Sequence, residues 1–102
     1  MSTDRVVLLT RPARHAWAQM VAGETVDREV DWTARLKGDE LAHSDFILPP
    51  GLKAAQASND KQVTGLRISG DAAGVYEVVN RVTTAKGREL EQAIKLRVKP
   101  AG

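Results

Sequence analysis

The sequence predicts an all-β fold, an Ig-like β-sandwich of about seven strands with a short N-terminal arm or helix. From residue 26 onward, several segments alternate apolar and polar side chains with the period of two that half-buried strands show. Clusters of Gly, Pro, Asn and Asp separate these segments at spacings of about 8–12 residues, which is typical of antiparallel sandwiches. The 102 residues suffice for one domain, and only 4% are aromatic, so we expect an aliphatic core.

The N-terminal segment has two candidate elements. Residues 3–9, TDRVVLL, can form a short first strand or an extended arm. A short helix is expected over residues 12–22. Thr10 can cap this helix, and Pro12 suits its first turn. Gly23 can end it in the left-handed conformation. The alternative is a coil that becomes ordered only against a partner.

A change of composition near Val26 sets the predicted domain boundary. Residues 1–25 are assigned to an arm or helix that can serve as an interface segment, and residues 26–102 to the sandwich. Trp17 is the expected anchor of a protein interface, because buried aromatic side chains often dominate binding energy. In the open alternative, the helix folds back and buries Trp17 against the sandwich. The expected interface residues are Leu9, Arg11, Arg14, Trp17, Met20 and Val21.

Four strands are expected between the N-terminal segment and the last hairpin. They are residues 26–36, 43–48, 52–58 and 62–69. The turn signals beside them are GDE at 38–40, PPG at 49–51, SNDK at 58–61 and GDAAG at 70–74. Trp32 lies on the same face of the first strand as Val30. We expect it in the core rather than stacked on a ligand, because a carbohydrate binder normally exposes several aromatic rings.

The clearest strand signal is GVYEVVNRVTTAKGRELEQAIKLRV, residues 74–98. Two alternating strands flank the turn at residues 84–87, where Gly87 can take a positive φ. Tyr76 is expected to pack along one side, with its hydroxyl group bonded to the backbone near a strand corner. The predicted core residues are Trp32, Phe46, Leu66, Ile68, Tyr76, Val78, Val82, Ile94, Leu96 and Val98.

Composition and charge exclude several classes of protein. The absence of cysteine excludes a disulfide scaffold and a thiolate metal site. The formal charge of +2 is too small to indicate a nucleic-acid partner, and the basic residues around His15 are interpreted as a solvated helix face. The apolar run at residues 6–9 is too short for a signal peptide, and no stretch could span a membrane. Alternating cations at the C-terminus, Lys95, Arg97 and Lys99, are interpreted as the wet side of an edge strand.

A search for chemistry gives one weak candidate. Asp39, Glu40 and His43 would share a face if they lay on a helix, and could then bind a metal ion. The segment is predicted to be a turn, however, and a turn aspartate more commonly binds nearby backbone amides. No serine has a nucleophile-elbow context, and GDAAG lacks the following Lys-Ser/Thr of a phosphate loop. We therefore expect no enzyme, no metal and no cofactor.

A series of short motifs runs through residues 26–98. They are Asp31-Trp32, Gly38-Asp39, Pro49 with Gly51-Leu52, Ser69-Gly70, Gly74, Tyr76 with Val78 and Asn80, Val82-Thr83-Thr84, and Gly87-Arg88. In this order and spacing the chain resembles the fiber-tail adaptor or neck-associated Ig-like virion proteins of tailed bacteriophages. Residues 1–25 lie outside the resemblance.

The resemblance implies a phage structural protein at the head–tail junction (neck or connector) or in the tail. Such a protein links fibre or tail components by protein–protein assembly without catalysis. The implied partners are connector, portal, tail or fibre proteins, and several copies are expected in a symmetric ring where modest contacts repeat. The implied location is the virion, after assembly in the host cytoplasm. The alternative is an Ig-like decoration or carbohydrate-binding module that helps the particle adhere to cells.

Overall fold

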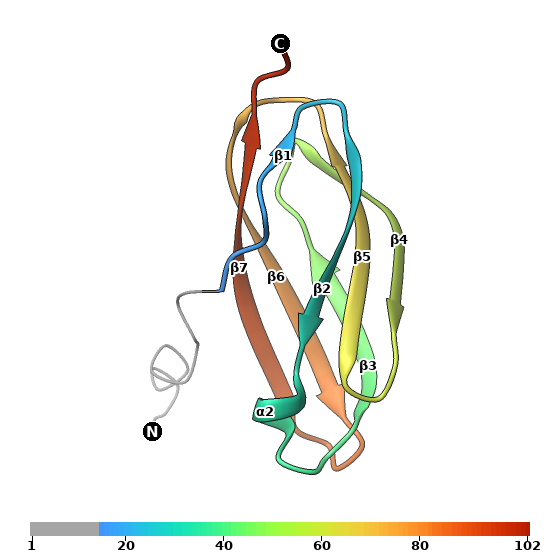
Figure 1. The fold of residues 1–102 in the computed structure, drawn as a ribbon. Helices are drawn as coiled ribbons and strands as arrows, with labels where there is room; N and C mark the ends of the chain where they lie inside the picture. The colour runs from blue at the N-terminus through green and yellow to red at the C-terminus, as the bar shows by residue number, and fades with distance from the viewer. Residues whose placement is uncertain (1–14) are drawn as a thin grey trace.

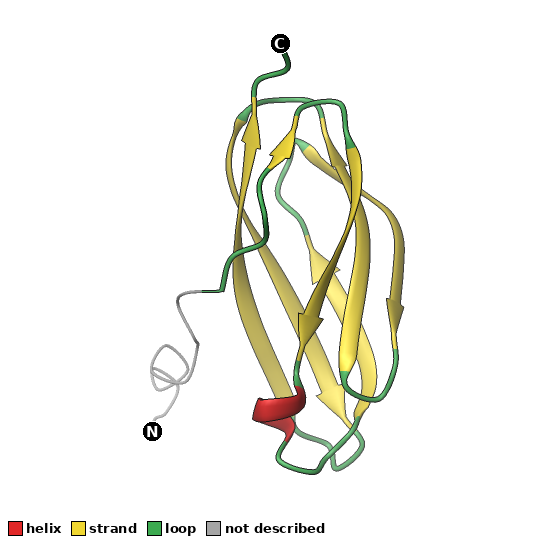
Figure 2. Ribbon diagram, in the orientation of Figure 1, coloured by secondary structure: helices red, strands yellow, loops and turns green. Residues whose placement is uncertain are grey.

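The structure, a computed structural model, describes residues 15–102, which form a sandwich of two β-sheets (Figure 1; Figure 2). One sheet has four strands in the order β1–β7–β6–β3, and the other has three in the order β2–β5–β4. The strands are β1 (Met20–Val21), β2 (Thr25–Asp31), β3 (Leu41–Ile47), β4 (Leu52–Asn59), β5 (Val63–Gly70), β6 (Gly74–Thr84) and β7 (Glu89–Lys99). The prediction of an all-β, Ig-like sandwich is confirmed.

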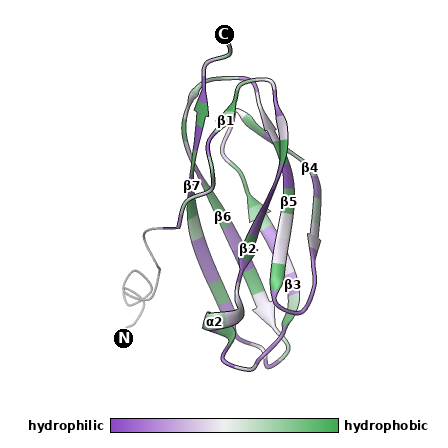
Figure 3. Ribbon diagram, viewed as in Figure 1, coloured by the Kyte–Doolittle hydropathy of each residue, from purple (hydrophilic) through white to green (hydrophobic). Residues whose placement is uncertain are grey.

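The core lies between the two sheets, because alternate residues of each strand point inward. Hydropathy alternates along the strands accordingly (Figure 3). The most deeply buried apolar side chains come from both sheets and include Ile68, Val78, Val82, Ile94 and Leu96, each with a relative exposure of 0%. Phe46 and Tyr76 are partly buried against this core. All ten predicted core residues therefore lie in the core or pack against it.

The last hairpin has the predicted geometry. Strands β6 and β7 pair antiparallel with Val78 opposite Ile94 and Val79 opposite Ala93. The turn closes with the Gly87 amide donating to the Thr84 carbonyl at 2.9 Å, and Gly87 has a φ of 87°. This is the left-handed conformation that glycine adopts without steric cost.

The N-terminal end of the described chain is extended, so the helix expected over residues 12–22 is wrong from residue 15 onward. The Trp17 amide donates to the Lys95 carbonyl at 3.0 Å, and the Lys95 amide donates to the His15 carbonyl at 3.1 Å. Further along, Met20 pairs in parallel with Val98. The chain thus uses backbone bonds along β7 and buries its apolar residues there, and tertiary packing overrides local helix propensity. The expected strand at residues 3–9 lies outside the described residues.

The strand predicted for residues 26–36 is wrong in its second half. Strand β2 ends at Asp31, and the short helix α2 (Thr33–Leu36) follows. The Asp31 carboxylate accepts bonds from the Thr33 amide at 2.9 Å and the Thr33 hydroxyl at 2.6 Å, which turns the chain. Such local side-chain bonds compete with a β-ladder. No helix of the described residues is long and apolar enough to cross a membrane.

Candidate interaction surfaces

One end of the sandwich is closed around Tyr76. Its hydroxyl donates to the Ala72 carbonyl at 2.7 Å, so the predicted bond at a strand corner is confirmed. Gly51 lies against the ring: a Cβ there would be 3.0 Å from the Cε1 atom of Tyr76, and its φ is +101°. Gly70 lies equally close to Leu52, with 2.9 Å between a built Cβ and Cδ2 of Leu52. Three motif pieces therefore pack together at this end.

The centre of the sandwich is held by Asn80, which is fully buried on β6. Its Oδ1 accepts bonds from the Trp32 indole at 2.9 Å and from the Thr64 hydroxyl at 2.7 Å. Its Nδ2 donates to the Ser44 hydroxyl and to the Asp45 carbonyl, each at 2.9 Å. Because Thr64 belongs to the opposite sheet, Asn80 joins the two sheets and fixes the Trp32 ring with no donor or acceptor left unpaired.

The opposite end is held by Arg88 and Asp39. The Arg88 guanidinium donates to the Asp39 carboxylate at 3.3 Å and to the Leu36 carbonyl at 2.8 Å. The pKa of Asp39 is lowered from 3.8, first by its bond to the Thr84 side chain, then by the Glu40 amide and Arg88, with burial opposing. Arg88 therefore ties the hairpin turn to the loop after α2.

The residues considered for a metal site point to different partners. Asp39 binds the Glu40 amide at 2.8 Å, the bond expected of a turn aspartate, while His43 contacts Asp45 at 3.2 Å. The Glu40 carboxylate lies 3.9 Å from the Lys61 ammonium group. Among residues 15–102, no group of three His, Cys, Asp or Glu side chains is placed to hold a metal ion.

The residues expected at an interface fall into two groups. Leu9, Arg11 and Arg14 lie outside the described residues. Trp17 is 8% exposed and Met20 2%, so both belong to the core, whereas Val21 is 37% exposed. The Trp17 indole donates to the Glu29 carbonyl at 2.9 Å, and its ring lies 6.1 Å from that of Phe46. Trp17 is thus buried against the sandwich, as in the open alternative, although through an extended segment and not a helix.

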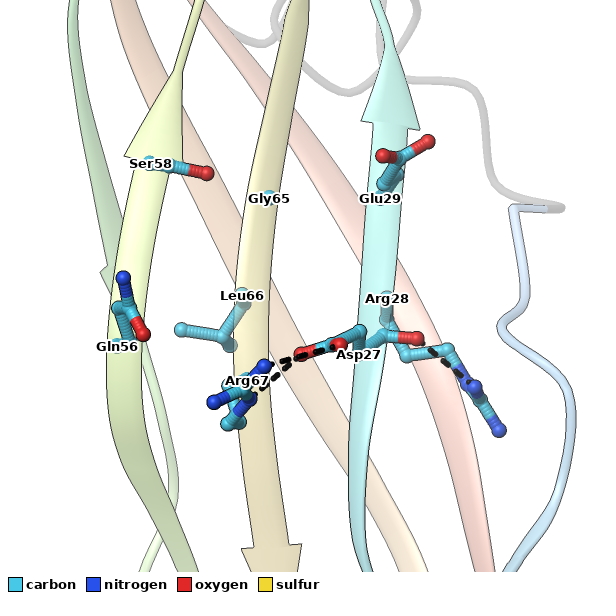
Figure 4. Close-up of a pocket in the computed structure, with 8 residues that line it drawn as sticks. All are labelled: Asp27, Arg28, Glu29, Gln56, Ser58, Gly65, Leu66 and Arg67. Carbon is cyan, nitrogen blue, oxygen red and sulfur yellow. Dashed lines mark hydrogen bonds and ion pairs between the residues drawn. The ribbon is translucent and has the colours of Figure 1, made fainter.

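The outer face of the three-stranded sheet carries a polar hollow (Figure 4). Gly65 forms its floor, because a Cβ there would lie 2.9 Å from the Ser58 hydroxyl oxygen. Beside it, Arg67 donates to Asp27 at 2.8 Å, which lowers the pKa of Asp27 and raises that of Arg67. The residues lining the hollow are Asp27, Arg28, Glu29, Gln56, Ser58, Gly65, Leu66 and Arg67. None is aromatic, so the hollow offers no ring for stacking a sugar.

The outer face of the four-stranded sheet is different in character. Ile47, Val79 and Ala93 are register partners on β3, β6 and β7 and point outward, forming what we call the apolar row. Ile47 is 46% exposed, and Val75, further along β6 on the same face, is 55% exposed. Sequence reasoning missed this surface because each strand contributes only one or two of its residues.

The cations of β7 flank the apolar row. Lys95 and Arg97 lie toward the C-terminal end of β7, where the strand is paired with β6 on one side and with β1 on the other. They therefore belong to an interior strand, and the interpretation as the wet side of an edge strand is wrong here. They lie on the sheet face that also exposes Val75 and Ile47, which makes this face the stronger candidate for protein contact.

Comparison with known proteins agrees with this geometry. Residues 20–97 match the family described as podophage GP4 fiber-tail adaptor protein gp77. The chain belongs to this family. The match begins at the first residue of β1 and ends within β7, so it covers both sheets. Family membership makes the chain a phage structural protein and a virion component, as the resemblance implied.

A solved structure supports the fold. The chain is similar to the solution structure of the PKD domain from KIAA 1837 protein, with a TM-score of 0.52 and 14% sequence identity. The similarity covers 82% of this chain and 80% of that chain. At this identity the similarity concerns the fold alone. No curated protein matches the chain.

The geometry also explains why the family can be recognised from sequence. The motifs that carry the resemblance are the residues that close the two ends and hold the centre: Gly51, Gly70, Tyr76, Asn80, Thr84 and Arg88 among them. These motifs therefore identify the fold.

Proposed function

We propose that this protein is an adaptor at the head–tail junction or in the tail of a podophage, where it links fibre or tail components by protein–protein contact and without catalysis. The observation that carries the proposal is the family match over residues 20–97. The described fold supports it, because the buried polar side chains Asp39, Thr64 and Asn80 form structural hydrogen bonds. All four aromatic side chains are buried or half-buried, which does not favour the alternative of a carbohydrate-binding module.

The segment before residue 15 is proposed as the main contact with another virion protein. It holds the expected interface residues Leu9, Arg11 and Arg14 and precedes the region that matches the family. Val21 is also available, since it is exposed on β1. Trp17 and Met20 would act indirectly, by anchoring the base of this segment to β7. We thus keep residues 1–25 as an interface segment and place its contacts chiefly before residue 15.

Several copies are proposed to surround the axis of the particle in a symmetric ring, with connector, portal, tail or fibre proteins as partners. Repetition of one modest contact around a ring gives strong overall attachment. The absence of cysteine suits a part that folds and assembles in a reducing host cytoplasm.

Incorporation into particles tests the proposal. The full chain and a variant lacking residues 1–14 would be supplied during assembly, and purified virions would be quantified by mass spectrometry. We expect the full chain in multiple copies per particle and the shortened chain at less than about a tenth of that level. Asn59→Ala, an exposed change at the end of β4, is the control and should be incorporated normally.

Two outcomes would contradict separate parts of the proposal. If purified virions did not contain the full chain, the proposed adaptor function itself would be contradicted. Normal incorporation of the shortened chain would contradict only the proposed role of the N-terminal segment. It would indicate that the sandwich forms the attachment surface.

A further inference from the structure

The outward side chains of the last hairpin have opposite charges at equal distances from the apolar row. On β7, Glu91 lies two residues before Ala93 and Lys95 lies two residues after it. Glu89 lies four residues before Ala93 and Arg97 four residues after it. All of them point outward, because the residues between them, such as Ile94 and Leu96, are buried. The charge pattern of β7 thus changes sign about Ala93.

Strand β6 also changes sign about the apolar row, but it runs antiparallel to β7, so the order of the signs in space is reversed. Glu77 lies two residues before Val79, and Arg81 lies two residues after it. Val79 is the register partner of Ala93, so the sign changes at the same level on both strands. On β7 the acidic residues are next to the hairpin turn and the basic residues are toward the C-terminal end, whereas on β6 Arg81 is next to the turn and Glu77 is away from it.

We infer that the outer face of the four-stranded sheet is a contact between two copies of this chain, stacked about a two-fold axis along the apolar row. Such an axis places Ile47, Val79 and Ala93 over the same residues of the second copy. Glu89 of each copy then faces Arg97 of the other, Glu91 faces Lys95, and Glu77 faces Arg81. A two-fold contact requires this kind of self-complementarity, since the same surface is used twice.

Sheet packing is compatible with this arrangement. Two sheets that stack face to face lie about 10 Å apart and cross at about 30°. The strands of the second copy run antiparallel to those of the first, so along each strand the acidic side chains of one copy cover the basic side chains of the other. Long Glu, Lys and Arg side chains can span the offset that the crossing introduces.

Pairing within one hairpin explains part of the pattern but not all of it. Glu77 is opposite Lys95 on the neighbouring strand, and Arg81 lies 2.7 Å from Glu91, so these charges also stabilise the hairpin. Glu89 and Arg97 are opposite Thr83 and Val75 instead. No other described residue forms an ion pair with them, and a second copy in this arrangement supplies each with a partner of opposite charge.

The inference rests on the proposal that several copies occur in the particle and not on their arrangement in a ring, and its test uses the isolated full-length protein. The mass of the native chain would be followed by sedimentation up to about 1 mM, where a dimer of millimolar Kd is visible. We expect a reversible dimer that weakens as salt is raised, because charged contacts are screened.

Two charge reversals give the decisive comparison. Arg97→Glu places glutamates against each other at both symmetry-related sites, and Glu89→Arg does the same with arginines. Each variant should raise the dimer Kd roughly ten-fold or more. An equimolar mixture of the two variants restores opposite charges at both sites, so the mixture should form a heterodimer while each variant alone remains monomeric. The double variant Glu89→Arg/Arg97→Glu should again dimerise with itself.

Controls separate this result from loss of folding. Both positions are outside ion pairs in the described structure, so thermal unfolding of the variants should match that of the native chain. Glu29→Arg, on the opposite sheet, should leave the dimer unchanged. A native chain that is monomeric up to about 1 mM would overturn the inference. So would a dimer that survives Arg97→Glu, or variants that fail to associate in the mixture. In each case the virion assay of the adaptor function would be unaffected.

Discussion

The interior of the sandwich and its outer faces use polar side chains in opposite ways. Inside, Asn80 has four hydrogen bonds of defined geometry, and their partners come from three separate parts of the chain. Outside, the Asp27–Arg67 pair is a solvated contact whose side chains are 69% and 50% exposed. The interior therefore specifies which fold forms, and the surface is left to specify which partner binds.

This comparison predicts the largest loss of stability for Trp17→Ala. Trp17 is only 8% exposed and its indole is bonded to Glu29, so we expect the free energy of unfolding to fall by about 4 kcal/mol. Urea denaturation measures the loss, with Val21→Ala, an exposed change four residues away, as the control. A loss below about 1 kcal/mol would show that residues 15–22 are not held against the sandwich in solution.

Asn80→Ala is expected to cost slightly less, about 3 kcal/mol, because it leaves the Trp32 indole and Thr64 hydroxyl buried without an acceptor. The matched control is Asn59→Ala, at the exposed end of β4, which should change the free energy of unfolding by less than about 0.5 kcal/mol. Near-UV circular dichroism should also change for Asn80→Ala alone, since Trp32 loses its fixed orientation. If the two substitutions lowered the free energy of unfolding equally, Asn80 would not have the central role proposed for it.

The strands and turns of the sandwich were predicted well from the sequence, because the patterns that indicate them are local. Period-two alternation, Gly87 in a turn and Tyr76 at a corner each depend on residues close in the chain. The N-terminal segment was predicted as a helix because Thr10, Pro12 and Gly23 have the residue types of helix ends. What decides its structure is the pairing with β7, about eighty residues away, and local propensity contains no information about that.

The candidate surfaces were harder to predict for the same reason. The apolar row takes one residue from each of three strands, and it exists only once the register of β3, β6 and β7 is known. The sign change of charge about Ala93 is visible in residues 89–97, but its meaning depends on which residues face outward together. The alternation along each strand predicted correctly which residues face outward. It could not predict which strands lie next to β7.

Acid should destabilise the end of the sandwich that contains Asp39. The folded pKa of Asp39 lies below 3.8, chiefly through its bond to Thr84. Its contribution to stability is therefore present above pH 3.8 and is lost as the pH falls through the folded pKa. Thermal unfolding at pH 7 and near pH 2 tests this: Asp39→Asn should lower the unfolding temperature at pH 7 and much less in acid. Asp71→Asn is the control, and an equal effect of Asp39→Asn at both values would contradict the prediction.

The smallest effect is expected for Arg67→Ala on the outer face of the three-stranded sheet. Its partner Asp27 is solvated, and exposed ion pairs contribute little once salt screens them. At physiological salt the urea midpoint should equal that of the native chain, and the dimer should remain intact. Arg97→Glu, on the other face, should also leave the midpoint unchanged but abolish the dimer. The two arginines are thus equally dispensable for folding, and a difference between them in self-association alone would locate the partner surface. A large loss of stability from Arg67→Ala would instead place the Asp27–Arg67 pair among the groups that hold the fold together.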